Sequence, residues 1–292
     1  MNAIEIRKLT KFYGEARGIV DVDLSVAAGE FFGFIGPNGA GKSTTIRILL
    51  GLISQSSGEA EIFGLNVNNY RQEVLKRVGY LPSEVEYYNG MRVKEIIDFS
   101  TKLRGGCSEN EVKSLCERFE LDTSRKVEEL SLGNRKKVGI VCALAHRPEL
   151  YILDEPTSGL DPLMQREFFS VLNERCAEGA TVFLSSHILS EVSRNCKRAA
   201  VIREGRIVKT DSVDKLGHTG VKRVMLKGIN SLPENRDISN VRVEGDAVRF
   251  LYGGGAKALT SLLSELSFDD FSVSDPELDE IFMHFYAGEG EK

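Results

Sequence analysis

A glycine-rich stretch near the N-terminus has the residue types and spacing that a phosphate group requires. It runs over residues 36–44 with the sequence Gly-Pro-Asn-Gly-Ala-Gly-Lys-Ser-Thr, between apolar runs at 31–35 and 45–50. Glycines let successive backbone N–H groups turn inward toward an anion, and the following helix adds its positive N-terminal end. Lys42 is then placed to reach the β- and γ-phosphates, and the Ser43 hydroxyl to ligate Mg²⁺. An incidental glycine-rich turn is the alternative, but the full strand–loop–helix context favours a nucleoside triphosphate site. The residues expected around the phosphates are Gly36, Asn38, Gly39, Ala40, Gly41, Lys42, Ser43 and Thr44.

Two adjacent acids, Asp154 and Glu155, follow a predicted buried strand at 150–153. Downstream of a phosphate loop, the first acid is suited to hold Mg²⁺ and the second to take a proton from an attacking water as general base. The alternative, that the two acids only cap the next helix, is plausible for such a pair alone. Their combination with Lys42 and Ser43 favours the catalytic interpretation.

Length and composition bound the class of protein. The chain has 292 residues, 41% of them hydrophobic and 28% charged, which is enough for one large soluble domain and a small one. No stretch approaches the ~18 consecutive apolar residues of a membrane span, and the first residues lack the apolar core of a signal peptide. The five scattered cysteines indicate reduced thiols in a cytosol.

The charge pattern gives no indication of nucleic-acid binding. The formal net charge is −5, and local basic clusters such as Arg135-Lys136-Lys137 are expected to be solvated helix faces.

Residues 59–63 are expected to form a strand. Apolar runs at 150–153, 181–184 and 199–202 are separated by helical segments, which is typical of an α/β fold with a parallel sheet. A helical lobe at about 84–147 interrupts this pattern.

Within the lobe, apolar residues follow a helical period over 93–103 and 111–119. Ser108 and Glu111 have the spacing of a capping box before the second helix.

A change of pattern after about Leu216 predicts a domain boundary, with residues 1–216 in the first domain and 217–292 in a small α+β appendage. Gly217 and Gly220 mark the expected linker. In the appendage we expect strands near Val224, at 241–243 and at 248–252, a helix around 259–266, and a last helix from Asp275.

Three more motifs complete the set. Leu130-Ser131-Leu132-Gly133-Asn134 precedes a helix, Ser158-Gly159-Leu160-Asp161 follows the two acids, and Ser185-Ser186-His187 closes the next strand. With the phosphate loop, these resemble the nucleotide-binding subunit of ABC transporters, from Tyr13 to about residue 215. The resemblance implies a P-loop NTPase core of the ABC type.

The resemblance also implies roles for individual residues. Tyr13 is expected to stack on adenine, and His187 to contact the γ-phosphate beside Lys42 and Glu155. Ser131 and Gly133, with Asn134, are expected to present a helix N-terminus to the γ-phosphate bound by a partner subunit, and Asp161 to line the subunit interface.

The motifs depart from the family pattern at two places. Leu132 replaces a glycine of the usual Leu-Ser-Gly-Gly-Gln signature, and Asn134 replaces its glutamine. Either Ser83 or Glu84 stands where the family has a glutamine that senses Mg²⁺ and the membrane partner. Both variants resemble those of export-type subunits associated with drug or antibiotic-peptide resistance.

The resemblance therefore implies an ATPase that uses ATP and Mg²⁺ and acts as a homodimer or a heterodimer of such cassettes. It is expected to lie in the cytoplasm, peripheral on the inner face of the cell membrane, where it powers export through a separate integral-membrane permease. One alternative is a soluble ABC ATPase that acts on ribosomes or nucleic acid. Such proteins usually carry two cassettes or a long coiled-coil insertion, and this chain shows neither. Another alternative is a regulatory module without turnover, against which Glu155 argues.

Overall fold

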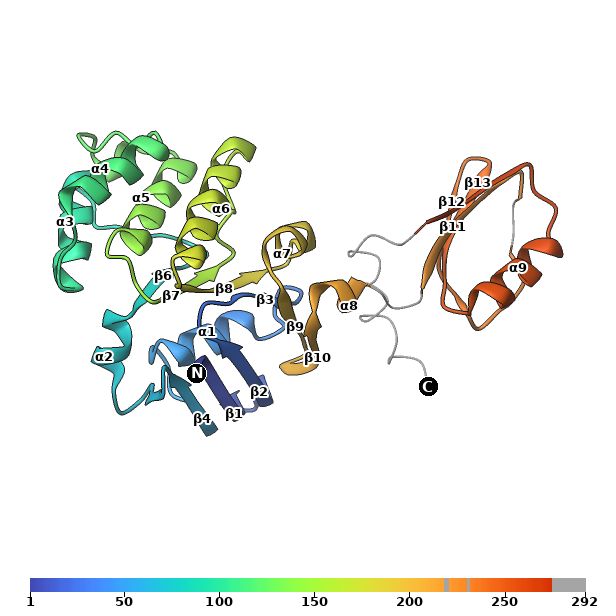
Figure 1. Cartoon of the computed structure of the whole chain (residues 1–292), viewed down its shortest axis with the longest axis horizontal. Coiled ribbons are helices and arrows are strands. Elements are labelled where there is room, and N and C mark those ends of the chain that lie inside the picture. Colours follow the sequence, from blue (N-terminus) through green and yellow to red (C-terminus); the bar gives the residue numbers. More distant parts are fainter. Residues whose placement is uncertain (218–220, 230–231, 275–292) are drawn as a thin grey trace. The chain divides into compact units, whose positions relative to one another are not determined.

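The computed structural model describes residues 1–217, 221–229 and 232–274 (Figure 1). The chain divides into two compact units, Met1–Asp211 and Ser212–Lys292. The first unit has the α/β fold that the alternation of strands and helices predicted.

A six-stranded sheet organises the first unit. Its strands lie in the order β10-β9-β3-β8-β7-β6, and β9, β3, β8, β7 and β6 run parallel. The bounds are β3 (Phe31–Ile35), β6 (Val78–Leu81), β7 (Leu150–Asp154), β8 (Thr181–Ser186), β9 (Arg198–Arg203) and β10 (Arg206–Ser212). Every residue of β3, β7 and β8 is buried, because helices or the second sheet cover both faces. Parallel strands bring their carboxyl ends to one edge, so segments far apart in sequence meet there.

A second, antiparallel sheet has the order β2-β1-β4-β5, with β1 (Asn2–Tyr13), β2 (Ala16–Ala27), β4 (Ser57–Ile62) and β5 (Leu65–Asn66). Helix α1 (Lys42–Leu49) contributes Ile46, Ile48 and Leu49 to a core shared by both sheets. The short helix α2 (Arg71–Lys76) precedes β6. The core therefore anchors the helix that follows the phosphate loop.

Helices α3 (Val93–Leu103), α4 (Glu109–Arg118) and α5 (Leu132–Leu144) form the helical lobe, with a 3₁₀ turn at Val127–Glu129, and α6 (Pro162–Ala177) lies beside them in Figure 1. Helix α7 (Leu189–Asn195) follows β8. The two predicted lobe helices are confirmed.

The predicted capping box at the start of α4 is wrong. Ser108 occupies the N-cap position, but its side chain makes no capping hydrogen bond. Glu111 instead accepts from Arg147 Nε at 2.9 Å and pairs with Arg175 in α6. Arg175 is only 6% exposed, and a buried guanidinium needs the carboxylate more than the helix end does.

The second unit contains a four-stranded antiparallel sheet in the order β12-β13-β11-β14. Its strands are β11 (Lys222–Lys227), β12 (Ile238–Glu244), β13 (Ala247–Tyr252) and β14 (Asp270–Ser274), and its helices are α8 (Val213–Gly217) and α9 (Ala256–Ser264). Leu259 and Leu262 of α9 pack on one face of the sheet, against Val224 and Phe250. The three expected strands and this helix are confirmed, whereas Gly217 belongs to α8 and β14 was not predicted. Gly220 and the helix expected from Asp275 lie outside the described residues.

The ion pair between Glu111 and Arg175 leads to a stability prediction. Glu111→Ala should lower the free energy of unfolding by about 2–3 kcal/mol, because Arg175 stays buried with Glu178 as its remaining partner. Urea titration measures this. Glu117→Ala on the same helix is the control, since its exposed pair with Lys113 at 3.9 Å should contribute at most about 0.5 kcal/mol. Equal losses of unfolding free energy in the two variants would contradict the role of Glu111 as the partner of the buried Arg175.

Candidate active site

The carboxyl edge of the parallel sheet holds a cavity of about 450 Å³ in the first unit. The loop after β3, Glu155 after β7 and His187 after β8 all reach it, together with the end of β1, whereas Asp154 does not line it. The lining residues are Tyr13, Arg17, Gly18, Pro37, Asn38, Gly39, Gly41, Lys42, Ser43, Thr44, Ser83, Glu84, Glu155, Ser158 and His187. Gly36 and Ala40 belong to the loop but are buried, and they do not line the cavity.

The phosphate loop is shaped so that only particular residues fit. Gly41 has φ +111°, and a Cβ there would lie 2.6 Å from Ile19 Cγ2, so glycine is required for both conformation and space. Helix α1 begins at the next residue, Lys42, which directs the unpaired N–H groups of its first turn toward the loop. The loop therefore has the geometry of an anion site.

Lys42 is 5% exposed and folds back over the loop. Its ammonium donates to Gly36 O at 2.6 Å and to Pro37 O at 3.2 Å. The same Nζ lies 3.2 Å from Glu155 Oε1, an ion pair without hydrogen-bond geometry. The cation that should meet phosphate thus touches the predicted general base.

Glu155 lies between two partners. Its Oε2 lies 2.6 Å from His187 Nδ1, whereas its buried Oε1 accepts no hydrogen bond from the described residues. The backbone of Glu155 has φ +48°, which is strained for this residue type and is typical of functional sites. A carboxylate oxygen without a hydrogen bond is a ready acceptor for the proton of a water molecule.

Asp154 ends β7 and is 2% exposed. Its Oδ1 accepts from Ser185 Oγ at 2.9 Å, and no ion pair with Asp154 is found in the described part of the chain. Burial of a carboxylate is costly, and a divalent cation beside it would offset that cost. With the Ser43 hydroxyl, it supplies the oxygen donors that Mg²⁺ prefers alongside phosphate. The residues present therefore fit the cation.

The remaining predicted residues of the cavity are accessible. Tyr13 is 46% exposed at the cavity wall, with the Lys11 ammonium 5.4 Å from its ring centre. Ser83 and Glu84 are both exposed and both line the cavity.

The signature residues do not line this cavity. Ser131 is the exposed N-cap of α5, and its side chain accepts from Asn134 N at 3.3 Å. A Cβ on Gly133 would lie 2.7 Å from Gly159 O, so a larger residue would push the two motifs apart. Asp161 caps α6 by accepting from Leu163 and Met164 N–H groups, each at 3.0 Å.

The expectation that Arg135-Lys136-Lys137 forms a solvated face is wrong. Lys136 is 2% and Lys137 8% exposed, because α5 is packed within the lobe on nearly every side. The ammonium of Lys136 donates to Pro82 O and Ser83 O, each at 2.8 Å, and to Glu155 O at 3.3 Å. Burial lowers its pKa to about 8. Val138 to Leu144, the residues that follow, are almost all apolar and leave no polar face on this part of the helix. That pattern could have predicted that the helix is buried at Lys136 and Lys137 as well.

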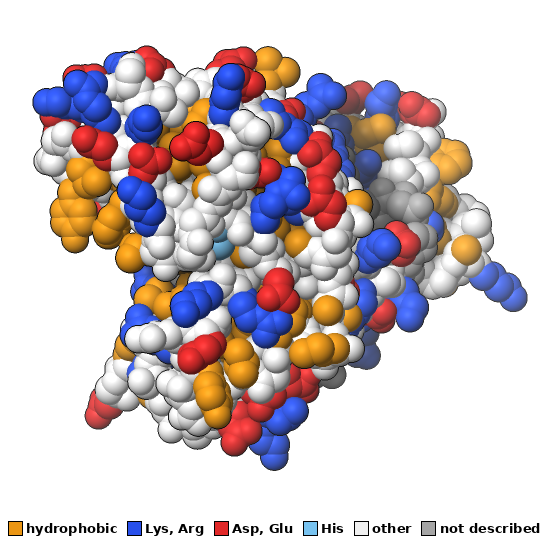
Figure 2. Space-filling view, turned by 60° about the vertical axis from the view of Figure 1, so that its left-hand side comes forward, with side chains coloured by type: hydrophobic (Ala, Val, Ile, Leu, Met, Phe, Trp, Pro, Cys, Tyr) orange, Lys and Arg blue, Asp and Glu red, His pale blue; other side chains and the backbone are white. Residues whose placement is uncertain are grey.

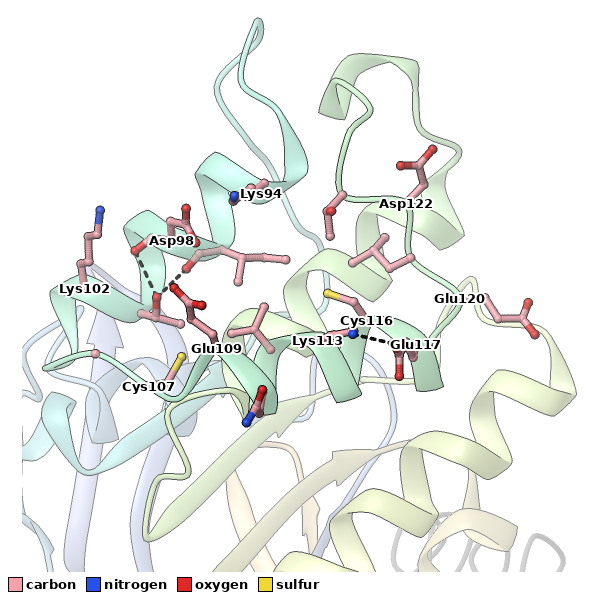
Figure 3. A pocket seen from close by; sticks show the side chains of 17 residues that line it. Lys94, Asp98, Lys102, Cys107, Glu109, Lys113, Cys116, Glu117, Glu120 and Asp122 are labelled. Carbon is pink, nitrogen blue, oxygen red and sulfur yellow. Dashed lines mark hydrogen bonds and ion pairs between the residues drawn. The ribbon is translucent and has the colours of Figure 1, made fainter.

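A larger cavity, about 880 Å³, lies between α3 and α4 (Figure 3). Lys94, Asp98 and Lys102 line it from α3, and α4 adds acidic and basic side chains that include the exposed pair Lys113–Glu117. It has no glycine-rich phosphate loop or facing catalytic acid. We therefore place the chemistry in the smaller cavity.

No helix in residues 1–217, 221–229 and 232–274 is long and apolar enough to cross a membrane.

Comparison with known proteins decides the family. Residues 19–158 match the family described as ABC transporter. The chain is 34% identical over 301 residues to the bacitracin transport ATP-binding protein BcrA of Bacillus licheniformis, covering 98% of this chain and 97% of that protein. The chain belongs to the ATP-binding proteins of ABC transporters. The family assignment made from the motifs is thereby confirmed.

Other relatives of this ATP-binding protein agree. The linearmycin resistance ATP-binding protein LnrL of Bacillus subtilis is 29% identical, with 96% of this chain and 97% of that protein covered. Among solved structures, an ATP-binding subunit of an ABC transporter has a TM-score of 0.69 at 32% identity, over 73% of this chain and 91% of that chain. The dimeric structure of MJ0796, a bacterial ABC transporter cassette, has a TM-score of 0.66 at 25% identity, over 72% of this chain and 98% of that chain. The protein is an ATPase of this family, as predicted.

Lys136 generates a prediction for the ATP-binding protein. Lys136→Met should leave three carbonyls without their donor and lower kcat about tenfold or more, because a loss of site geometry is costly for catalysis. Steady-state ATPase assays and thermal melting test it. Lys113 is an exposed lysine on α4, so Lys113→Met is the control and should change neither kcat nor Tm. Wild-type turnover by Lys136→Met would refute the role.

Proposed function

We propose that this ATPase powers the export of a drug or antibiotic peptide through a separate membrane permease. The proposed mechanism of ATP hydrolysis rests on one observation: Lys42 contacts Glu155, and Glu155 contacts His187, at the cavity wall. The export part rests on the relatives, which include proteins named for bacitracin transport and linearmycin resistance.

In the proposed mechanism, Lys42, Ser43 and the N–H groups of the loop hold the β- and γ-phosphates of ATP, and Tyr13 stacks on adenine. Gly36, Asn38, Gly39, Ala40, Gly41 and Thr44 complete the loop. Asp154 and Ser43 would hold Mg²⁺, with Ser83 or Glu84 nearby; the ion supplies positive charge to the phosphate oxygens when bound. Most of these residues line one cavity, and Gly36, Ala40 and Asp154 are buried next to residues that do.

Proton transfer is assigned to Glu155. When phosphate competes for Lys42, the ammonium leaves Oε1. This oxygen then accepts the proton of the water that attacks the γ-phosphorus, while the bond from that phosphorus to the bridging oxygen breaks and ADP leaves. His187 stays against Oε2 and orients the carboxylate.

We propose that a second ATP-binding subunit completes the site. Ser131, Gly133 and Asn134 stand at the exposed start of α5, outside the home cavity, where they can meet nucleotide held by another copy. Asp161 lies beside them at the start of α6, since Gly133 closely approaches Gly159. Nucleotide shared by two copies would couple hydrolysis to their separation.

The permease is proposed to dock on the helical lobe, which would place the protein on the inner face of the cell membrane. Tyr88 is 82%, Phe99 58% and Leu103 64% exposed, and exposed aromatic and apolar side chains are enriched at interface cores. Tyr87, in contrast, packs inside the lobe and donates to Arg135 O at 3.3 Å. Hydrophobic side chains also gather at the edge of the lobe in Figure 2.

The face shown in Figure 2 does not favour the alternative of a nucleic-acid or ribosome partner. Basic and acidic side chains are interspersed over the face shown in Figure 2, without the continuous basic patch that a phosphate backbone attracts. The named relatives are transport and resistance proteins.

Glu155→Gln should abolish turnover while retaining MgATP, because it removes the base and keeps the site's shape. Lys42→Ala should lose both binding and turnover. ATPase assays paired with binding of a fluorescent ATP analogue distinguish the two. Turnover of Glu155→Gln within a few-fold of wild type would show that Glu155 is not the general base, since loss of a general base lowers the rate ~10²-fold or more.

Ser131→Arg should leave ATP binding by one copy intact and block ATP-dependent dimerisation, because its bulk stands at a close phosphate contact. Sedimentation of this variant in the Glu155→Gln background with MgATP measures it. Ser114→Arg, at an exposed position of α4, is the control and should still dimerise. An undiminished Ser131→Arg dimer would refute the shared site.

Tyr88→Ala should impair co-purification with the permease while ATPase activity and Tm stay near wild type, because the side chain is exposed. Tyr70→Ala, an exposed tyrosine outside the lobe, should have no effect on either. A large fall in Tm with normal permease binding would show that Tyr88 serves folding instead.

A further inference from the structure

Glu191, in α7, is a buried carboxylate for which the proposed reaction has no use. It is 7% exposed and does not line the nucleotide cavity. Its Oε1 accepts from Thr157 Oγ1 at 2.6 Å, and its Oε2 accepts from Ser186 Oγ at 2.8 Å. Burial raises its pKa, whereas the two hydroxyls act in the opposite direction. Both carboxylate oxygens are therefore engaged by short hydrogen bonds inside the protein.

The two hydroxyls belong to the two segments that carry the proposed chemistry. Thr157 stands two residues after Glu155, and Ser186 stands immediately before His187. Glu155 N also donates to Ser185 O at 3.0 Å, and Ser186 Oγ accepts from Ile188 N at 2.9 Å. One carboxylate therefore joins the turn after β7 to the turn after β8.

The two turns that Glu191 joins carry Glu155 and His187, whose contact depends on the exact positions of both turns. Glu155 Oε2 and His187 Nδ1 lie 2.6 Å apart, and Glu155 holds a strained φ of +48°. Such a backbone conformation persists when surrounding structure over-determines it. The His187 side chain is 52% exposed, so its own packing does little to hold it.

We infer that Glu191 is a positioning residue that fixes the Glu155 carboxylate against His187 by holding both segments at once. The inference rests on the proposed roles of Glu155 and His187. Glu191 touches no nucleotide, so it acts on turnover through geometry and leaves ATP binding, which depends on the loop of residues 36–44, intact.

The variants follow from the hydrogen bonds. Glu191→Ala removes both acceptors, while Glu191→Gln keeps the size, accepts through its carbonyl oxygen and donates through its amide to the other hydroxyl oxygen. We expect Glu191→Ala to lower kcat about 10- to 100-fold with KM for ATP changed less than about threefold, since misplacement of a catalytic group costs rate. Glu191→Gln should restore kcat to within about threefold of wild type. Thr157→Val and Ser186→Ala should each lower kcat, and their double variant should lose less than the product of the two effects, because both act through one carboxylate.

Ser193→Ala is the matched control for the hydroxyl variants. Ser193 lies on the same helix and donates to Leu189 O at 3.1 Å, a contact within that helix, so removal of its hydroxyl should leave kcat unchanged. Tm is measured for every variant, and assays are run well below the lowest value.

The outcomes separate the inference from the proposed function. If Glu155→Gln abolishes turnover but Glu191→Ala keeps wild-type kcat, the positioning role is overturned and the catalytic assignment stands. The positioning role is also overturned if kcat and KM change together in Glu191→Ala, or if Glu191→Gln is as slow as Glu191→Ala. Normal turnover by Glu155→Gln would overturn the proposed function itself.

Discussion

The ion pair between Lys42 and Glu155 is the contact on which the site depends. It joins the phosphate loop after β3 to the acid after β7, two segments more than a hundred residues apart that a parallel sheet brings to one edge. Lys42 holds one oxygen of Glu155 and His187 the other, so the carboxylate is balanced between a cation that phosphate can draw away and a ring that stays. That competition would link nucleotide binding to the release of the base.

Groups outside the cavity hold this arrangement from two directions. Lys136 of α5 donates to the Glu155 carbonyl and to the carbonyls of Pro82 and Ser83. Glu191 of α7 accepts from Thr157 and Ser186. The first connects the helical lobe to the base, and the second connects the base to the histidine. A movement of the lobe, such as a permease contact would cause, would therefore reach Glu155 through the backbone.

Much of the fold and the core of the site could be predicted from the sequence. The phosphate loop and the Asp154-Glu155 pair are local patterns whose chemistry depends on spacing, and β3 and β7 are continuous apolar runs. Lys136 and Glu191 were missed because burial of a charge is decided by partners from distant segments, which a local pattern does not contain. The capping box failed for the same reason, since Glu111 met Arg175 of α6. The strand β14 was missed because its exposed residues give no buried face to recognise.

In the proposed reaction, Lys42 releases Glu155 when it binds phosphate. This exchange can be observed in a high-resolution structure of the wild-type protein with Mg²⁺ and a non-hydrolysable ATP analogue. We expect Lys42 Nζ to leave its position 3.2 Å from Glu155 Oε1 and to lie within hydrogen-bond distance of the β- and γ-phosphate oxygens, with Oε1 facing a water molecule. An analogue bound in this cavity with Lys42 still paired to Glu155, or bound instead between α3 and α4, would contradict it.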